Sequence, residues 1–231
     1  MNILALDTSM GACSAAVLRT DGAERKLFAR REIMARGHAE ALMPMVAEVM
    51  QESGTAFASL DLIAATVGPG SFTGVRIAIA GARGFALATG ARLWGIDSLT
   101  VMAKAALEGG MAADGKPFAV AVNARGDRLY FGLYDADRRK LAGPVLIDAG
   151  EAAALLPEEL GTAVGNGAGH LAEAAMLRGH RLEAKLADLQ PNAAALAELA
   201  LEADETLPTL RPLYLRPPDA KPQAASAVAR R

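Results

Sequence analysis

The stretch Thr66–Gly90, TVGPGSFTGVRIAIAGARGFALATG, decides how the rest of the chain is interpreted. It begins as the end of an apolar strand predicted over Leu62–Val67 and turns through a glycine-rich loop, 68–74. It then continues as an apolar segment too long for one strand, which predicts a helix over 75–89. A strand, a glycine loop and a helix N-terminus in this order bring free N–H groups and a positive dipole end together, which favours an anion.

The predicted helix 75–89 has only two charged residues, Arg76 and Arg83, which lie seven apart and share a face. All its other residues are Ala, Gly, Ile, Val, Leu, Phe or Thr. A helix that is apolar nearly all round is usually buried nearly all round, so we expect solvent to reach little of this helix.

Length and composition are those of an ordinary globular chain. The 231 residues suffice for one large domain or two small ones, and the net charge of −2 gives no electrostatic case for binding nucleic acid unaided. One cysteine, Cys13, excludes an internal disulfide and fits a reducing compartment, so we expect a cytoplasmic location. Asp7 ends the first apolar run after six residues, which argues against a signal peptide, and no run is long enough to span a membrane.

The N-terminus predicts a hairpin with a polar tip: Asn2–Leu6 and Cys13–Arg19 are apolar strands on either side of Asp7-Thr8-Ser9. A carboxylate and hydroxyls there suit a phosphate or a metal-bound water, and an Asx-type turn closed by Asp7 is the commoner alternative. The glycine loop has a similar alternative, a tight turn passing close to this hairpin, because it lacks the lysine of a Walker motif. The candidate nucleotide or anion site consists of Asp7, Thr8, Ser9, Gly68, Gly70, Ser71, Thr73 and Gly74.

The helix predicted over 37–52 carries two apolar stripes, more than one core contact needs. The stripes are Leu42, Met45, Val46 and Val49, and beside them Ala39, Met43, Ala47 and Met50. Core filling and a protein interface are both open interpretations of the second stripe. Pro44 predicts that the helix starts near Ala41 or bends at the proline. His38 is interpreted as a capping or hydrogen-bonding residue.

The second half repeats the pattern of the first. Strands predicted over 118–122 and 128–134 enclose a polar tip, as in the first hairpin, which indicates a weak internal duplication. We expect a half at 1–107 with the glycine loop and partner-binding helices, a smaller half at 108–216 whose last segments pack back on the first, and a tail at 217–231. The other predicted elements are strands over 23–33, 93–96, 140–147 and 162–164 and helices over 98–107, 150–156, 171–178 and 191–203.

Two such halves resemble the actin-like, sugar-kinase and Hsp70 ATPase (ASKHA) architecture, which implies an α/β fold with two βββαβα-type halves, the second reduced. Six segments resemble the TsaB family more closely and occur in its order between Leu4 and Arg216. They are LALDTS, GHAEALMP, TVGPGSFTGVRIAIAGARGFA, NARGDRLYFGLY, VGNGA and PLYLR.

This resemblance implies a partner subunit in making threonylcarbamoyladenosine on the adenosine next to the anticodon of tRNA. Transfer belongs to the paralogue TsaD, and the ATPase TsaE completes the complex. We therefore expect a non-catalytic chain that requires no cofactor itself, with ATP or ADP at most in the complex. It would meet tRNA only through the complex and have no membrane partner.

The residues argue against transfer by the chain itself. TsaD-like proteins hold a metal with two histidines one helical turn apart, and the matching positions here are Ser98 and Met102. An active actin-fold ATPase or phosphotransferase is the alternative, based on the Asp7 hairpin and the glycine loop. Asn123 stands where we expect aspartate in the second hairpin, which weakens that alternative. We therefore expect this chain to contain no metal ligands and no catalytic residues.

The same resemblance predicts that the first two helices of the N-terminal half pack against the equivalent pair of TsaD, or of a second copy in a homodimer. The residues expected in this interface are Met43, Val46, Met50, Ile77, Ala78, Gly81 and Phe85. Direct tRNA binding would need a basic face, and the basic clusters are interpreted as solvated surface instead. They are Arg30-Arg31, Arg138-Arg139-Lys140 and, in the tail, Lys221, Arg230 and Arg231.

Overall fold

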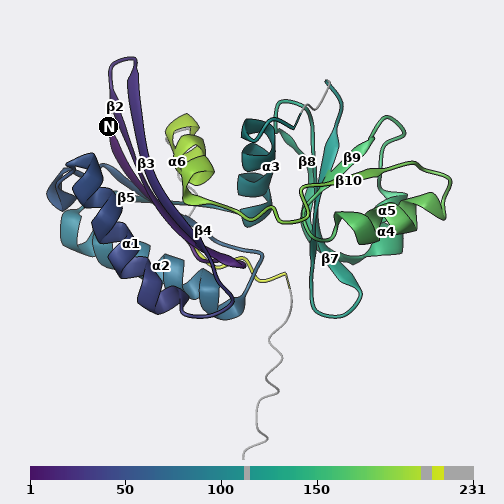
Figure 1. The fold of residues 1–231 in the computed structure, drawn as a ribbon, viewed down its shortest axis with the longest axis horizontal. Helices are drawn as coiled ribbons and strands as arrows, with labels where there is room; N and C mark the ends of the chain where they lie inside the picture. Colours follow the sequence, from purple (N-terminus) through teal and green to yellow (C-terminus); the bar gives the residue numbers. More distant parts are fainter. Residues whose placement is uncertain (112–114, 204–209, 216–231) are drawn as a thin grey trace, which may run out of the picture.

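The structure, a computed structural model, describes residues 1–111, 115–203 and 210–215. Two α/β halves lie side by side, each built around its own five-stranded sheet (Figure 1). The predicted tail 217–231, with Lys221, Arg230 and Arg231, lies outside the described residues. No helix of the described ranges is long and apolar enough to cross a membrane.

The first half follows the predicted order of elements. Its sheet has the order β3-β2-β1-β4-β5, in which the first three strands are antiparallel and β4 and β5 lie parallel to β1. Its elements are β1 (Asn2–Asp7), β2 (Ala12–Asp21), β3 (Glu24–Ile33), α1 (His38–Ser53), the 3-10 turn η1 (Phe57–Ser59), β4 (Leu62–Thr66), α2 (Phe72–Thr89), β5 (Arg92–Ile96) and α3 (Ser98–Glu108).

The second half repeats this topology. Its sheet has the order β10-β9-β6-β7-β8, so in both halves the strands run third, second, first, fourth, fifth across the sheet. This confirms the predicted ASKHA-type fold class. Its elements are β6 (Phe118–Asn123), β7 (Arg128–Tyr134), β8 (Lys140–Asp148), α4 (Ala149–Ala154), β9 (Thr162–Val164), α5 (Ala168–Met176) and β10 (Glu183–Lys185), followed by α6 (Ala193–Glu202).

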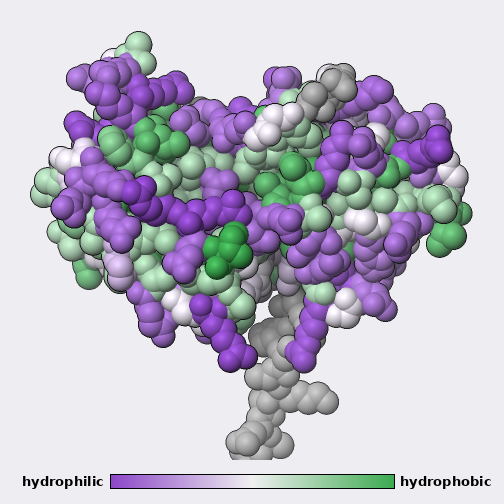
Figure 2. Space-filling view, in the orientation of Figure 1, coloured by the Kyte–Doolittle hydropathy of each residue, from purple (hydrophilic) through white to green (hydrophobic). Residues whose placement is uncertain are grey.

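Helices cover both faces of the first sheet. Along β1, Leu4 and Leu6 face the side packed by α1 and α2, whereas Ile3 and Ala5 face the side packed by α6. A strand buried on both faces must be apolar throughout, which explains the uninterrupted run at the N-terminus. The edge strand β3 is charged and mostly exposed, and hydrophilic side chains cover this part of the surface in Figure 2. Charges on an edge strand oppose pairing with other chains.

Helix α1 contains Pro44 in its interior. It begins at His38 and continues through Pro44 to Ser53, so the predicted alternative of a start near Ala41 is wrong, and a bend at the proline stays a prediction. The stripe with Leu42 and Met45 packs into the core of the first half. That packing outweighs the loss of one backbone hydrogen bond at the proline.

Helices α3 and α6 lie between the two sheets (Figure 1). Along the chain α3 belongs to the predicted half 1–107, yet its Leu99 and Met102 pack into the core of the second sheet. Helix α6 follows the second half along the chain but packs on β1 and β2, so this late segment returns to the first half. Helix α3 therefore packs on the second sheet and helix α6 on the first, opposite to their order along the chain.

Ion pairs near α3 and α6 join the two halves. Lys140 Nζ lies 2.5 Å from Asp97 Oδ2, and Glu202 accepts from Lys104 Nζ at 2.8 Å and from an Arg138 guanidinium nitrogen at 3.0 Å. Two members of the predicted basic cluster Arg138-Arg139-Lys140 thus pair with carboxylates of this chain rather than standing free in solvent.

The segment 210–215 docks beside α2. Leu213 N donates to the Val67 carbonyl at 2.7 Å, and an Arg83 guanidinium nitrogen donates to the Leu210 carbonyl at 2.8 Å. The Leu210 side chain is 4% exposed in the core of the first half. The end of the described chain is therefore part of the first half.

We expect Leu210→Ala to lower the free energy of unfolding by about 2–5 kcal/mol, because it removes a buried side chain and leaves a cavity. Leu87→Ala is the matched control: this leucine is 90% exposed, and its truncation should change stability by less than about 0.5 kcal/mol. Urea denaturation followed by circular dichroism measures both. Equal, small effects would show that the segment does not hold the first half together.

Candidate functional site

Asp7 lies at the carboxyl end of β1, and its carboxylate is hydrogen-bonded within the tip. Asp7 Oδ1 accepts from Ser9 Oγ at 2.7 Å, from Thr66 Oγ1 at 2.5 Å and from Ser9 N at 3.2 Å. Asp7, Thr8 and Ser9 are each 0% exposed. The bond to Ser9 N is that of an Asx-type turn, the alternative that sequence reasoning considered commoner.

The environment of Asp7 favours its neutral form. Burial raises the pKa of its carboxyl above 3.8, although hydrogen bonds from Thr66 and Ser9 oppose the shift. Among the described residues Asp7 Oδ2 has no hydrogen-bond partner. A carboxyl enclosed by protein, with its pKa raised by burial, is poorly suited to supply charge to a metal-bound phosphate.

The glycine loop lies directly against this hairpin. A Cβ on Gly70 would stand 2.2 Å from the Ser9 carbonyl oxygen, and one on Gly74 would stand 2.0 Å from the Thr8 carbonyl oxygen. Thr8 Oγ1 also donates to the Gly74 carbonyl at 2.6 Å. The two backbones touch, so no phosphate fits between them, and the geometry favours the close-turn alternative on this side of the loop.

Other groups of the loop also have partners within the protein. Ser71 N donates to the Ser9 carbonyl at 2.7 Å, and Ser71 Oγ caps α2 by accepting from Gly74 N at 3.1 Å. Gly68 adopts a φ of +105°, and its carbonyl accepts from Ser98 N at 2.8 Å. Thr73 faces solvent. The structure thus brings all the predicted anion-site residues together, and an anion on the outer side of the loop stays a prediction.

The second hairpin is fastened by a pair of asparagines. Asn123 Nδ2 donates to the Asn166 carbonyl at 2.8 Å, and Asn166 Oδ1 accepts from Asn123 N at 2.8 Å. An aspartate at position 123 could not donate the first bond. The amide therefore joins the β6–β7 tip to the loop before α5, which gives Asn123 a structural role.

The tip of the first hairpin is packed against the second half. Met10, like Tyr130 and Leu189, packs against the core cluster of the second sheet, and Gly11 N donates to Gln190 Oε1 at 2.9 Å. His38 Nε2 lies 3.0 Å from the Met10 carbonyl, which confirms its predicted hydrogen-bonding role. In this arrangement the protein's own side chains occupy space between the hairpin and the second sheet.

The two positions that align with metal-binding histidines of TsaD-like proteins are both buried. Ser98 Oγ donates to the Pro69 carbonyl and so holds the glycine loop, while Met102 is 0% exposed in the core of the second half. Both side chains contribute to packing.

The predicted interface residues divide into two groups, and part of that prediction is wrong. Val46, Met50 and Ala78 are 1%, 4% and 0% exposed in the core of the first half, so their side chains do not reach the surface. The expectation that helix 75–89 is buried nearly all round is also wrong, because α2 buries one face only. Its buried residues are Gly74, Val75, Ala78, Ile79 and Ala82.

The remaining interface residues form a partly exposed apolar surface. Met43 is 46% exposed and reaches across to Gly81, where a Cβ would lie 3.3 Å from its methyl carbon. Ile77 and Phe85 are half-buried, and the ring of Phe85 stacks on that of Phe57 at 5.4 Å. Phe57 was missed by sequence reasoning, since its short apolar segment carries no periodic signal. We call these five residues the α1–α2 surface.

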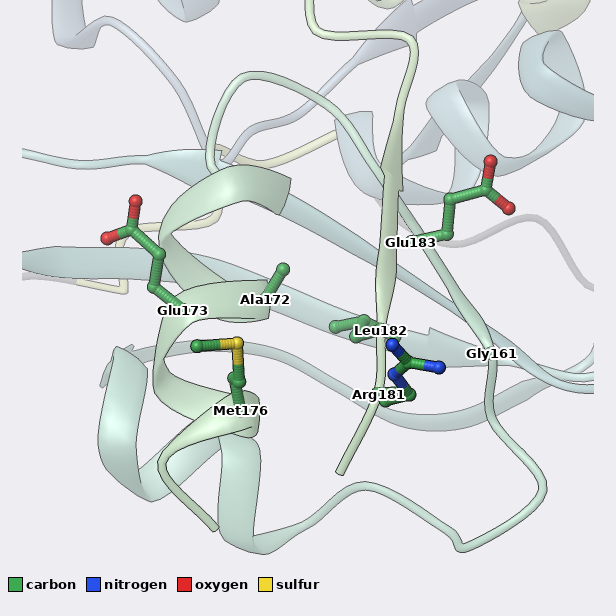
Figure 3. A pocket seen from close by; sticks show the side chains of 7 residues that line it. All are labelled: Gly161, Ala172, Glu173, Met176, Arg181, Leu182 and Glu183. Carbon is green, nitrogen blue, oxygen red and sulfur yellow. The ribbon is translucent and has the colours of Figure 1, made fainter. Parts of the chain in front are cut away.

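A shallow pocket of about 530 Å³ lies elsewhere, between α5 and β10 of the second half (Figure 3). It contains none of the predicted site residues. Its lining consists of Gly161, Ala172, Glu173, Met176, Arg181, Leu182 and Glu183.

Comparisons with known proteins agree with the fold. A family model described as TsaD, tRNA N6-adenosine threonylcarbamoyltransferase, matches residues 31–215. A crystal structure of an uncharacterised Pseudomonas aeruginosa protein with similarity to peptidase YeaZ superimposes with a TM-score of 0.81 at 30% identity, covering 93% of this chain and 99% of that one. The structure of YeaZ from the same organism gives a TM-score of 0.74 at 31% identity, with 87% and 92% covered.

Among curated relatives, the Escherichia coli tRNA threonylcarbamoyladenosine biosynthesis protein TsaB is 37% identical over 137 residues, 59% of this chain and 56% of the relative. The chain thus spans about half the length of the TsaB relatives it matches. An uncharacterised Mycobacterium tuberculosis protein is 32% identical over 227 residues, 96% of this chain and 95% of the relative.

The fold and the site define an ASKHA-type protein with a buried first hairpin and a closed glycine loop. The identity and coverage of these relatives narrow the class further: the chain belongs to the TsaB family.

Gly74→Ala should lower the free energy of unfolding by about 1–3 kcal/mol or more, because the new Cβ meets the Thr8 carbonyl and the backbone must shift. Gly84→Ala, also within α2, has nothing within 4 Å of the added Cβ and should raise stability by about 0.5–1 kcal/mol. Thermal denaturation measures both variants. If Gly74→Ala were as stable as Gly84→Ala, the contact between loop and hairpin would be refuted.

Asp7 should make stability fall as pH rises. Its folded pKa is raised, so its contribution is complete below the unfolded pKa of 3.8 and is lost as pH rises through the folded value. Within that window the slope is up to about 1.4 kcal/mol per pH unit.

Asp7→Asn keeps an oxygen acceptor and cannot ionise, so its stability relative to the wild type should improve from acid toward neutral pH. Asp127→Asn, at an exposed position of the second hairpin, is the control. Urea denaturation over a pH series measures the difference. A difference between wild type and Asp7→Asn that does not change with pH would contradict a raised pKa of Asp7.

Proposed function

We propose that this chain is a non-catalytic partner subunit for threonylcarbamoyl transfer to the adenosine next to the anticodon of tRNA. It would act with a TsaD-type transferase and a TsaE-type ATPase in the cytoplasm. The names of the curated relatives support the pathway. The observation that carries the subunit role is the α1–α2 surface, an exposed apolar area on two neighbouring helices.

The composition of the α1–α2 surface supports a protein partner. Met43 and Phe57 are 46% and 39% exposed, and Ile77 and Phe85 are half-buried. Gly81 accommodates this chain's own Met43 and Leu42, whereas a Cβ on Gly84 would meet nothing within 4 Å. A second backbone can therefore approach α2 closely at Gly84. Contiguous apolar area of this kind commonly marks a protein interface.

The geometry of the hairpin and glycine loop supports a role without catalysis by the chain alone. Asp7 is enclosed and favours its neutral form, and the loop backbone touches the Thr8 and Ser9 carbonyls. Asn123 is engaged by Asn166. These contacts disfavour the alternative of an active ATPase, so we propose that the chain requires no cofactor and that any ATP or ADP belongs to the assembled complex.

Without the transferase, the same surface should join two copies of the chain. The apolar area would otherwise face water, and a homodimer related by two-fold symmetry covers it with an identical patch. The partner's paralogous helices would then replace those of the second copy.

Met43→Glu combined with Ile77→Glu should reduce capture of a TsaD-type partner in co-purification by at least about tenfold, because two carboxylates would be buried without partners. Met43→Glu alone changes a side chain that is 46% exposed, so it should fold normally and controls for misfolding of the double variant. Met176→Glu, 73% exposed on the second half, is the matched control and should bind normally.

Sedimentation at a few tens of micromolar should likewise show a dimer for the wild type and a monomer for Met43→Glu. Undiminished capture of the partner by the double variant, or a wild type that is monomeric in this range, would refute the α1–α2 surface as the interface.

A further inference from the structure

Two exposed aromatic rings and an arginine meet where α2 begins. Phe72 and Tyr214 stack with their ring centroids 5.3 Å apart. The Arg76 guanidinium carbon lies 3.6 Å from the Phe72 centroid, and Arg76 Nε donates to Tyr214 Oη at 2.8 Å. We call these three residues the aromatic platform. Its members come from segments 138 positions apart in the chain.

The platform is fixed in place by the docking of 210–215. Leu213 is hydrogen-bonded to the Val67 carbonyl, Arg83 holds the Leu210 carbonyl, and the Leu210 side chain is buried. Tyr214 is thereby held next to Phe72 before any ligand arrives. A preorganised platform loses little conformational entropy on binding.

The rings nevertheless remain open to solvent. Phe72 is 53% exposed and Tyr214 is 47% exposed, more than any other aromatic side chain in the described ranges. Core packing does not account for two half-exposed rings in a chain with only 4% aromatic residues. A flat ligand that stacks on the part of the rings that Arg76 leaves open would shield them from water.

The two segments that form the platform are cationic, although the chain as a whole has a net charge of −2. Neither α2 nor 210–215 contains an Asp or Glu, whereas they contribute Arg76, Arg83 and the exposed Arg211. Within the described residues no ion pair joins any of these arginines to a carboxylate. Exposed rings interleaved with arginines match the two parts of a nucleotide, a flat base and a phosphate.

The platform and the α1–α2 surface lie on different sides of α2. At about 100° per residue, Phe72, Arg76 and Arg83 fall within about 40° of one another, whereas Ile77 and Gly81 lie about 100–180° from them. A partner on the α1–α2 surface therefore leaves the platform free.

We propose that the aromatic platform stacks an unpaired base of single-stranded RNA, with Arg211 and Arg83 near the flanking phosphates. The inference rests on the proposed function in one respect: tRNA is the RNA that a TsaB-family subunit would meet. The contact is direct, and differs from the expectation that tRNA is reached only through the complex.

Fluorescence anisotropy of the purified full chain with a labelled oligoadenylate of about 12 nucleotides tests the proposal. Phe72→Leu combined with Tyr214→Leu should weaken binding at least about tenfold, because base–aromatic stacking is lost. Arg211→Gln should lower the slope of log affinity against log salt by about one. Leu177→Ala, at an 88% exposed position of the second half outside both surfaces, should bind as the wild type does.

Several results would overturn the proposal. They are no saturable binding by the wild type at about 50 mM salt, equal affinity of the Phe72/Tyr214 variant, equal binding of a duplex, or displacement of the oligonucleotide by free ATP. Loss of TsaD-type partner capture in the Phe72/Tyr214 variant would assign the platform to a protein contact instead. Failure of the proposed function has a different signature, normal partner capture by Met43→Glu with Ile77→Glu.

Discussion

Backbone contact between the glycine loop and the first hairpin is the constraint on which the first half depends. Gly70 and Gly74 have no side chain because the Ser9 and Thr8 carbonyl oxygens occupy that space. The contact fixes where α2 begins, and thereby where its faces point. One face reaches the sheet, a second forms the α1–α2 surface, and a third carries the two arginines.

The two arginines of α2 connect this helix to the end of the described chain. Arg83 holds the backbone of 210–215 and Arg76 holds the ring of Tyr214. Because the segment lies against Val67 and Gly68, it contacts the start of the same loop that the hairpin contacts at Gly70 and Gly74. The end of the described chain therefore supports the start of α2, and it contributes one of the two rings of the aromatic platform.

The sequence predicted most of the fold because apolar runs and turn residues are local signals. Strand β10 escaped prediction, since three residues with one apolar side chain carry no period, and only pairing with β9 defines it. Burial was harder to foresee. Val46, Met50 and Ala78 look like surface candidates in the pattern, but which apolar stripe faces the sheet depends on how α1 and α2 sit on it. The predicted anion-site residues lie close together in the structure, whereas the contact that closes the loop depends on distances between backbones, which the sequence pattern does not contain.

The same limit applies to charge. Arg138 and Lys140 read as solvated surface, yet they pair with Glu202 and Asp97 from remote parts of the chain. Conversely, the chain as a whole is slightly acidic. The arginines of α2 and 210–215 can attract a phosphate only because these two segments contain no carboxylate. Net charge averages over the molecule, whereas a phosphate responds to charges within about 10 Å, the screening length at about 0.1 M salt. A chain with a net negative charge can therefore present a local surface suited to RNA, provided that its acidic residues are held elsewhere, as Glu202 and Asp97 are held between the two halves.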